Sequence, residues 1–284
     1  MSDIYVDLHI HTNYSDGVFT PSQAADYAAQ MKLAAISITD HDSVDGIDEA
    51  VAAAKDKGVE VISGIELSCV TGEELKDEIH ILGYFIDYKS QKFKNVLEEF
   101  KEARRQRARQ IYEKLKAANV VLKNTDFFEN AKGKSIGRMH FAKALVEEKF
   151  VGGIQEAFQR YLSRDKPAYA PKKNLTASDG IKLILENGGI PVMAHPYYTH
   201  YSDRNMKLSL IKDGLMGIEA WHSKHPESAV KKFLSMAQEY GLIATGGSDC
   251  HGPFKNERPI MGRVRVPYSV VENLAKAKEK LIKS

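Results

Sequence analysis

The stretch DLHIHTNYSDG (residues 7–17) decides the architecture from the start of the chain, because it sets polar residues directly behind the apolar run IYV. The first part of this segment is typical of a short β-strand. Side chains of a strand alternate between its two faces, so His9 and His11 point to the same side. Asp7 shares this side and is suited to orienting a ligand, whereas Asp16 follows in a turn. The pattern therefore predicts a site built on the end of the first strand.

Strand and helix patterns alternate on both sides of a long central segment. The expected strands cover residues 4–10, 33–39, 59–67, 78–85, 190–196, 215–222 and 242–251. The expected helices cover residues 20–32, 44–58, 178–189, 226–241 and 267–284. This alternation predicts parallel βαβ units, and about seven strands fit either an open doubly wound sheet or a barrel.

The central segment differs in composition, because one long charged helical pattern and two shorter helical patterns fill it. We therefore expect an α/β domain formed by residues 1–88 and 173–284, with an α-helical insertion domain at residues 89–172. The basic run RRQRAR (residues 104–109) spreads its charges around the expected helix. This spread predicts a solvated helix face rather than a patch that binds RNA.

Length and composition limit the classes of protein to consider. The chain has 284 residues, of which 43% are hydrophobic and 27% charged, as is ordinary for a globular protein. Its net charge of +2 gives no global field that would favour nucleic acid or membranes. Two cysteines do not make a disulfide framework, and we see neither a signal peptide nor an apolar run long enough to span a membrane. We expect a cytoplasmic protein with no membrane association and no obligate protein partner.

Histidine, aspartate or glutamate lies at or near the end of almost every expected strand. The candidates for metal binding are His9, His11, Asp16, His41, Glu66, His80, His195, Asp249 and His251. Functional groups of parallel α/β folds gather at the carboxyl ends of the strands, so these residues are expected to meet in space. Each residue alone has an ordinary alternative, such as a hydrogen-bonded core histidine for His80 or a plain turn for Asp16. Their coincidence favours a metal site.

The ligand types narrow the choice of metal and the chemistry. Imidazoles and carboxylates without cysteine thiolates suit Zn, Mn or Fe. Nine candidate ligands exceed the roughly three that one catalytic zinc takes from a protein, so the count indicates two or three ions. Clusters of this kind activate water and hold the oxygens of a phosphoryl group during in-line displacement.

At these motifs the sequence resembles the PHP family, the polymerase and histidinol phosphatase superfamily of metal-dependent phosphoesterases. The matching motifs follow one another along nearly the whole chain: DLHIHTNYSDG, SITDHDSVDG, GIELSC, EIHILGY, VMAHP and GGSDCH. The resemblance implies a distorted (β/α)7 barrel with a trinuclear metal centre. It implies three ligand sets: His9, His11, Glu66 and Asp249 for one ion, Glu66, His80 and His195 for a second, and Asp16, His41 and His251 for a third.

Two further motifs, IGRMHFAKAL and YLSRDKPAYAP, resemble a subgroup of this family. The subgroup includes phosphatases that act on 3',5'-bisphosphate nucleotides and exoribonucleases that act from the 5' end. Its GRxH motif reaches the substrate phosphate, which implies this role for Arg138 and His140. The planar fork of guanidinium donors suits phosphate oxygens. His222 ends an expected strand and is a candidate catalytic residue for substrate binding or proton transfer.

These observations predict a metal-dependent phosphoesterase that hydrolyses nucleotide phosphomonoesters, such as adenosine 3',5'-bisphosphate, by attack of a metal-bound hydroxide on phosphorus. The expected cofactors are divalent Mn, Fe or Zn ions, three per chain, and the expected partner is a phosphorylated nucleotide or short oligonucleotide. Three alternatives stay open: a 5'→3' exoribonuclease on short 5'-phosphorylated RNA, a metal-dependent amidohydrolase-type enzyme, and a non-catalytic nucleotide-binding module. Because histidine ligands must be deprotonated, activity is expected to fall below about pH 6.

Overall fold

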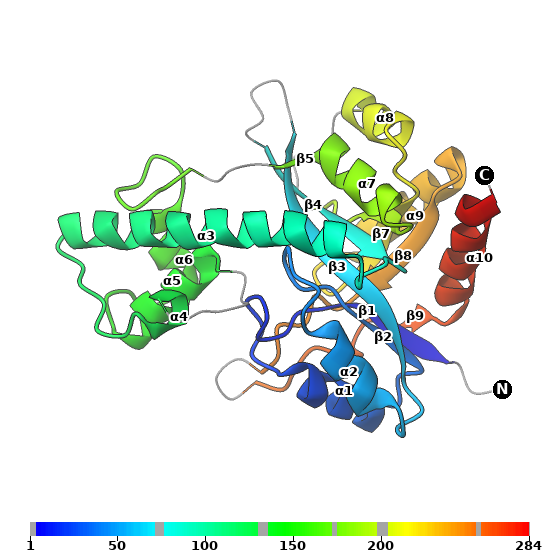
Figure 1. Cartoon of the computed structure of the whole chain (residues 1–284), viewed down its shortest axis with the longest axis horizontal. Helices are drawn as coiled ribbons and strands as arrows, with labels where there is room; N and C mark the ends of the chain where they lie inside the picture. Colours follow the sequence, from blue (N-terminus) through cyan, green and yellow to red (C-terminus); the bar gives the residue numbers. More distant parts are fainter. Residues whose placement is uncertain are drawn as a thin grey trace. The chain divides into compact units, whose positions relative to one another are not determined.

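The computed structural model describes residues 4–71, 77–129, 136–171, 175–197, 204–253 and 257–283. The chain divides into two compact units; Figure 1 shows their helices and strands, with labels where there is room. The first unit comprises Met1–Lys94 and Asn174–Ser284, and the second comprises Asn95–Lys173. Within the described residues, no helix combines the length and the apolar character needed to cross a membrane.

The strands of the first unit form one sheet. In chain order they are β1 (Tyr5–Ile10), β2 (Ala35–Ile38), β3 (Glu60–Thr71), β4 (Asp77–Tyr84), β5 (Leu175–Thr176), β6 (Ile190–Met193), β7 (Gly217–His222), β8 (Ile243–Gly247) and β9 (Val266–Pro267). Their order in the sheet is β8-β7-β6-β4-β3-β2-β1-β9, with β5 paired to β3. The sheet curls until Ile10 pairs with Cys250, just beyond β8, and the His11 N–H donates to the Cys250 carbonyl at 2.9 Å. The sheet is a nearly closed barrel, which confirms the predicted fold class.

Among the strands expected from the sequence, one departs from the predicted parallel arrangement; the short β9, which was not predicted, also pairs antiparallel, with β1. β4 pairs antiparallel with both β3 and β6, whereas β1, β2 and β3 pair in parallel with one another, as do β6, β7 and β8. The connection between β3 and β4 spans only residues 72–76, and a parallel return needs a crossover of about a dozen residues. His80 therefore enters the site from the middle of an antiparallel strand, where it is paired with Ser68.

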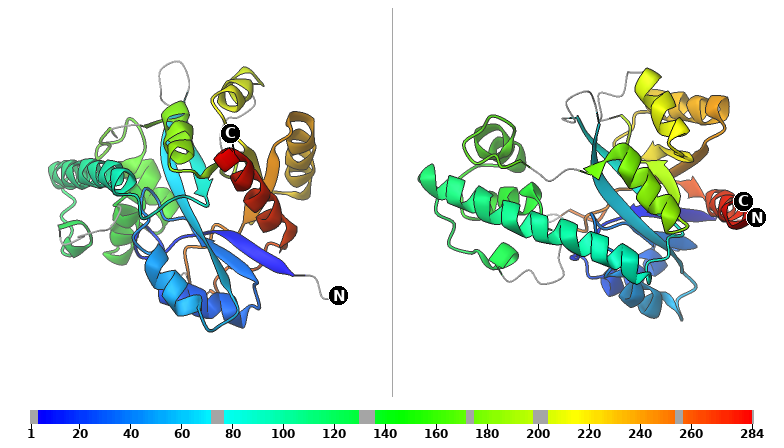
Figure 2. Two further views of the ribbon diagram at one scale, coloured as in Figure 1. Left: turned by 45° about the vertical axis from the view of Figure 1, so that its right-hand side comes forward. Right: turned by 45° about the horizontal axis from the view of Figure 1, so that its top comes forward.

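The helices of the first unit are α1 (Pro21–Gln30), α2 (Ile47–Ala54), α7 (Ala177–Glu186), α8 (Arg204–Lys212), α9 (Glu227–Tyr240) and α10 (Ser269–Lys283). α8 packs against α7, and the others pack against strands of this sheet. α1 starts at a capping box, in which the Thr20 hydroxyl accepts the Gln23 N–H and the Gln23 side chain accepts the Thr20 N–H. The buried Ala24 and Ala28 of α1 belong to a core cluster shared with β1 and β2. α1 and α2 lie side by side (Figure 2).

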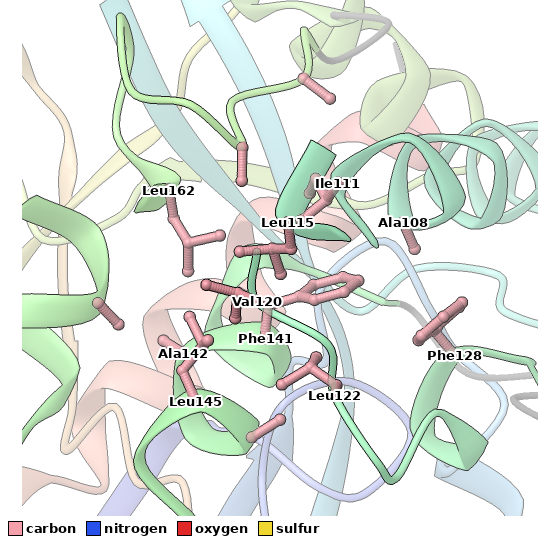
Figure 3. Close-up of a cluster of buried hydrophobic side chains, with 14 of the residues drawn as sticks. Ala108, Ile111, Leu115, Val120, Leu122, Phe128, Phe141, Ala142, Leu145 and Leu162 are labelled. Carbon is pink, nitrogen blue, oxygen red and sulfur yellow. The ribbon is translucent and has the colours of Figure 1, made fainter. Parts of the chain in front are cut away.

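The second unit is helical. It contains most of α3 (Gln91–Ala117) and then α4 (Asp126–Glu129), α5 (Arg138–Glu147), α6 (Ile154–Ala157) and the π-helical turn η1 (Phe158–Leu162). In its core, Ile111 and Leu115 of α3 join Phe141 and Leu145 of α5 in one buried cluster (Figure 3). All residues of this cluster lie within the second unit, so this unit has a hydrophobic core of its own.

Gly247 marks a close approach between β8 and β1. A Cβ atom added there would lie 2.4 Å from the backbone nitrogen of His9 and 2.5 Å from its Cβ atom. Because the backbone of β1 would have to shift, we expect Gly247→Ala to lower the free energy of unfolding by about 2–3 kcal/mol. Urea denaturation of the variant and the wild type measures this difference. Gly153→Ala is the matched control, since nothing lies within 4 Å of a Cβ at that position. Equal losses in the two variants would contradict the proposed strand contact.

Candidate metal centre

The end of β1 brings two imidazoles into contact. His9 and His11 are fully buried, and their Nε2 atoms lie 3.1 Å apart. Two nitrogen lone pairs at this distance repel each other unless a proton or a cation lies between them. The strand alternation expected from the sequence therefore brings together two imidazole nitrogens that can both bind one cation.

Glu66 of β3 lies at the centre of a histidine cluster. The distances from its carboxylate oxygens are 2.9 Å to His80 Nδ1, 2.9 Å to His195 Nε2, 3.1 Å to His41 Nδ1, 3.2 Å to His11 Nε2 and 3.5 Å to His9 Nε2. Oε1 faces His80 and His195, whereas Oε2 faces the other histidines. The two oxygens thus divide the imidazoles into two groups, which is the arrangement that a carboxylate bridging two ions requires.

Two aspartates extend the cluster beyond His11. Asp249 Oδ1 lies 3.2 Å from His11 Nε2 and 3.6 Å from His9 Nε2. Asp16 Oδ1 lies 3.2 Å from His251 Nε2 and 3.7 Å from His11 Nδ1. The rings of His11 and His251 stack with 4.3 Å between their centroids. All nine residues that the sequence singled out as metal candidates are therefore brought to one site.

Three overlapping groups of the described residues place one ligand atom of each member within 4.8 Å of the others. They are His11, Asp16, His41 and His251; His9, His11 and Glu66; and His41, Glu66 and His80. This donor set of imidazoles and carboxylates fits divalent ions such as Zn, Mn or Fe. The His251 side chain is 34% exposed, whereas that of His9 is completely buried, so the cluster opens to solvent on one side.

Burial and close charges perturb the protonation of the cluster. Burial disfavours a charged imidazole at His11, yet hydrogen bonds to Asp249 and Glu66 outweigh it and raise its pKa to about 10. At His80 burial again disfavours the charged imidazole, but the charge of Glu66 outweighs burial and raises the pKa to about 9. At His41 burial prevails over the charge of Glu66 and lowers the pKa to about 3. The surrounding imidazoles overcome burial at Glu66 and hold its pKa well below its ordinary value.

Two buried aspartates beside the metal candidates organise the backbone. Asp7 accepts the N–H of Ser248 at 2.8 Å and the N–H of Gly262 at 2.9 Å. Asp40 accepts the N–H of Thr12 at 2.7 Å and its hydroxyl at 2.6 Å. Asp7 was expected to orient a ligand, and its contacts are with backbone groups rather than with an imidazole ring. These bonds hold in place the segments that carry the metal candidates at the ends of β1 and β8.

His222 of β7 lies beside the cluster. Its Nε2 atom is 3.4 Å from Asp249 Oδ2, and its Nδ1 atom accepts the N–H of Lys224 at 3.2 Å. Because Nδ1 accepts a hydrogen bond, the proton of the neutral ring resides on Nε2, next to the carboxylate. The candidate proton-transfer residue is thus adjacent to a metal candidate and nearly buried.

The predicted phosphate-binding residues lie in the helical unit. Arg138 is the first residue of α5, its Nη1 donates to the Leu162 carbonyl at 3.5 Å, and its guanidinium lies 5.7 Å from the centre of the Phe158 ring. His140 Nδ1 accepts the Gly137 N–H at 3.2 Å and so caps the start of α5. Both side chains are therefore held by contacts within their own unit.

The basic run at residues 104–109 is only partly solvated. Arg104 and Arg107 are 7% and 9% exposed, and they donate to the carbonyls of Ile136 at 3.4 Å and Ala170 at 2.9 Å. Arg105 instead pairs with acidic side chains on the exposed face of α3. The prediction of a solvated face is wrong for Arg104 and Arg107, because the helix turns these positions toward backbone carbonyls that need donors.

Glu219, a carboxylate in the middle of β7, was not predicted from the sequence. It is fully buried, with Oε1 2.9 Å from His9 Nδ1 and Oε2 2.7 Å from the backbone nitrogen of His195. Burial would raise its pKa, but the charge of His9 and its hydrogen bond lower the value below the ordinary one. A charged residue inside the apolar strand GIEAWH was the available signal, because a buried carboxylate requires partners.

Comparison with known proteins places the chain in a family. A family model described as the PHP domain matches residues 7–168. The chain is 33% identical over 264 residues to a 3',5'-nucleoside bisphosphate phosphatase from Chromobacterium violaceum, covering 90% of each chain. It is 31% identical over 256 residues to a 5'-3' exoribonuclease from Haemophilus influenzae, covering 87% of this chain and 90% of that protein.

Solved structures give the same result at the level of the fold. A structure of an amidohydrolase from Chromobacterium violaceum with bound sulfate and no metal matches with a TM-score of 0.83 and 30% identity, covering 96% of both chains. A structure from Bifidobacterium adolescentis assigned as a metal-dependent phosphoesterase matches with a TM-score of 0.84 and 26% identity, covering 95% of both chains. The order of the motifs, the barrel and the family match agree, and the chain belongs to the PHP domain family.

Proposed function

We propose that this protein is a metal-dependent phosphoesterase that releases phosphate from nucleotide 3',5'-bisphosphates. The observation that carries the proposal is the buried Glu66, whose two carboxylate oxygens face five imidazoles at 2.9–3.5 Å. Such a cluster suits several divalent ions and little else. The relative named as a 3',5'-nucleoside bisphosphate phosphatase, at 33% identity over 90% of both chains, supports the choice of substrate.

We propose three ions per chain, with manganese, iron or zinc as the metals. The first ligand set is His9, His11, Glu66 and Asp249, the second is Glu66, His80 and His195, and the third is Asp16, His41 and His251. When bound, such ions supply a water-derived nucleophile at neutral pH and neutralise the charge of phosphoryl oxygens. Sites made of imidazoles and carboxylates accept several divalent metals, so elemental analysis of the purified protein is the measurement that identifies the metal.

The chain's own residues have the remaining tasks of binding and proton transfer. His222 Nε2, beside Asp249 Oδ2 at 3.4 Å, holds a proton that can pass to the leaving oxygen when the phosphate ester breaks. Arg138 and His140 are proposed to bind a substrate phosphate through their guanidinium and imidazole donors. Asp7 and Asp40 keep the ligand-bearing segments in position through their hydrogen bonds to backbone N–H groups.

A 5'→3' exoribonuclease is the second candidate function. The relative from Haemophilus influenzae, named as a 5'-3' exoribonuclease, shares 31% identity over 87% of this chain and favours this alternative. The hydrolytic chemistry is the same for both candidates, so only the length of the accepted substrate separates them.

The test compares three substrates in the presence of Mn²⁺: adenosine 3',5'-bisphosphate, AMP and a 5'-phosphorylated oligoribonucleotide. We expect phosphate release from the bisphosphate and no shortening of the oligonucleotide. Stepwise shortening instead would assign the exonuclease function. An amide hydrolysis assay with the same protein tests the amidohydrolase alternative. The double variant His9→Ala/His11→Ala is the control for contaminating phosphatases.

The role proposed for Arg138 predicts a defect in substrate binding. Arg138→Ala is expected to lower kcat/KM for the bisphosphate by about 10–100-fold, mainly through KM, because a charged donor to phosphate is lost. The metal content of the variant should equal that of the wild type. Arg105→Ala on the exposed face of α3 is the matched control, since Arg105 pairs with Glu98 and Glu102. An unchanged KM in Arg138→Ala would exclude this role.

A further inference from the structure

Glu219 is a buried carboxylate of the barrel that none of the proposed metal sets uses, and unlike Asp7 and Asp40 it contacts the ring of a metal candidate. It lies on β7, opposite Thr245 of β8, and neither residue has any exposed surface. A buried carboxylate is costly unless hydrogen-bond donors satisfy both oxygens. Glu219 meets this condition with two partners that belong to different proposed metal sets, His9 and His195.

The first partner is the imidazole of His9. Glu219 Oε1 lies 2.9 Å from His9 Nδ1, and a carboxylate can only accept there, so the ring proton of His9 resides on Nδ1. In the neutral ring that a metal ligand requires, Nε2 then carries the lone pair, 3.1 Å from His11 Nε2 and 3.5 Å from Glu66 Oε2. A carboxylate behind an imidazole fixes the tautomer and the orientation that a metal ligand needs.

The second partner is the backbone of His195. Glu219 Oε2 accepts this N–H at 2.7 Å. The φ angle of His195 is +25°, which is unfavourable for a residue with a side chain and requires support from its surroundings. The same residue directs its Nε2 atom to Glu66 Oε1 at 2.9 Å. The hydrogen bond to Glu219 therefore holds a strained backbone in the conformation that brings His195 to the cluster.

We propose that Glu219 is a positioning residue of the metal centre, which uses its two oxygens to align His9 of the first ligand set and His195 of the second. This inference rests on the proposed metal-dependent function. Only a carboxylate of this length serves both partners. The amide introduced by Glu219→Gln would offer one acceptor and place a donor against the other N–H group, and the shorter side chain of Glu219→Asp would withdraw the carboxylate by one methylene.

The test is the affinity of the purified protein for Mn²⁺, measured by competition with a chelating dye. Both Glu219→Gln and Glu219→Asp are expected to bind Mn²⁺ about 10–100-fold more weakly than the wild type. Thr245→Val is the matched control, because it removes a buried polar atom from the position opposite Glu219 and is expected to keep the wild-type affinity. Circular dichroism melting of each variant measures the fold independently of the metal.

Each outcome has a separate meaning. Variants that bind Mn²⁺ as tightly as the wild type, whatever their melting temperature, would overturn the positioning role and leave the proposed function intact. A wild type that binds no Mn²⁺, Zn²⁺ or Fe²⁺ would instead remove the proposed function. If neither variant folds, nitrogen-15 NMR of the Zn²⁺-loaded wild type tests the inference, because it shows which ring nitrogen of His9 carries the proton. The His9 signals are identified by their loss in His9→Gln. A proton on His9 Nδ1 is expected, and a proton on Nε2 would overturn the inference.

Discussion

Replacing Glu66 by glutamine is expected to abolish activity, with kcat/KM lowered by about 10³-fold or more. The carboxylate contacts His80 and His195 through one oxygen and His41 through the other, at 2.9–3.1 Å. An amide keeps the size of the side chain but loses the negative charge and one acceptor. The variant should therefore lose bound metal as well as activity, because no other described residue faces both groups of imidazoles with a carboxylate.

Metal content by plasma mass spectrometry and initial rates of phosphate release measure the two effects of Glu66→Gln together. Glu60→Gln is the matched control, since Glu60 lies at the other end of β3 and is exposed. We expect this control to retain both metal and activity. A Glu66→Gln protein that kept its metal and its rate would show that the carboxylate at the centre of the cluster has no catalytic importance.

Metal binding is expected to release protons and to strengthen as the pH rises. Without metal, the pKa values of His11 and His80 are about 10 and about 9, so both imidazoles carry a proton at pH 7.5. A histidine that binds a metal must be deprotonated to the neutral imidazole, so binding displaces both protons. Apparent affinity should then increase by about tenfold per pH unit for each proton displaced, from pH 6 up to pH 9.

Isothermal titration of the metal-free protein with Mn²⁺ in two buffers of different ionisation enthalpy measures this proton release.

The stability of the metal-free fold is expected to change with pH in the opposite direction to the metal affinity. The raised pKa values stabilise the metal-free fold fully below pH 6.5, and this contribution is lost as the pH rises through 9 and 10. The melting temperature of the metal-free protein should therefore fall over that range. Binding without proton release, at an affinity independent of pH, would contradict the described cluster.

The fold could be predicted from the sequence where local patterns were strong. The helix expected at residues 20–32 and the alternation of His9 and His11 both depend on neighbouring residues, and both are present in the structure, the helix as α1 (Pro21–Gln30). The direction of β4 depends on the length of a connection rather than on the strand's own residues. Because strands and helices alternate elsewhere in the chain, parallel strands were expected throughout, and the antiparallel direction of β4 was missed.

The candidate site could be predicted for residues that stand out chemically at strand ends, such as His195 and Asp249. Glu219 could not be predicted in this way, because its role depends on a hydrogen bond to His9, 210 positions away in the chain. The burial of Arg104 and Arg107 could not be predicted from the sequence for the same reason. Their charges suggested exposure, and only the fold reveals the carbonyls of Ile136 and Ala170 that accept their hydrogen bonds.

The central claim is that metal held by this histidine and carboxylate cluster is needed to hydrolyse a nucleotide phosphomonoester. The most direct measurement is phosphate release from adenosine 3',5'-bisphosphate by protein stripped with a chelator, before and after addition of Mn²⁺, Fe²⁺ or Zn²⁺. We predict no release from the stripped protein, restoration by at least one of these ions, and no restoration in His9→Ala/His11→Ala. Full activity of the stripped protein, or metal binding without phosphate release, would contradict the account.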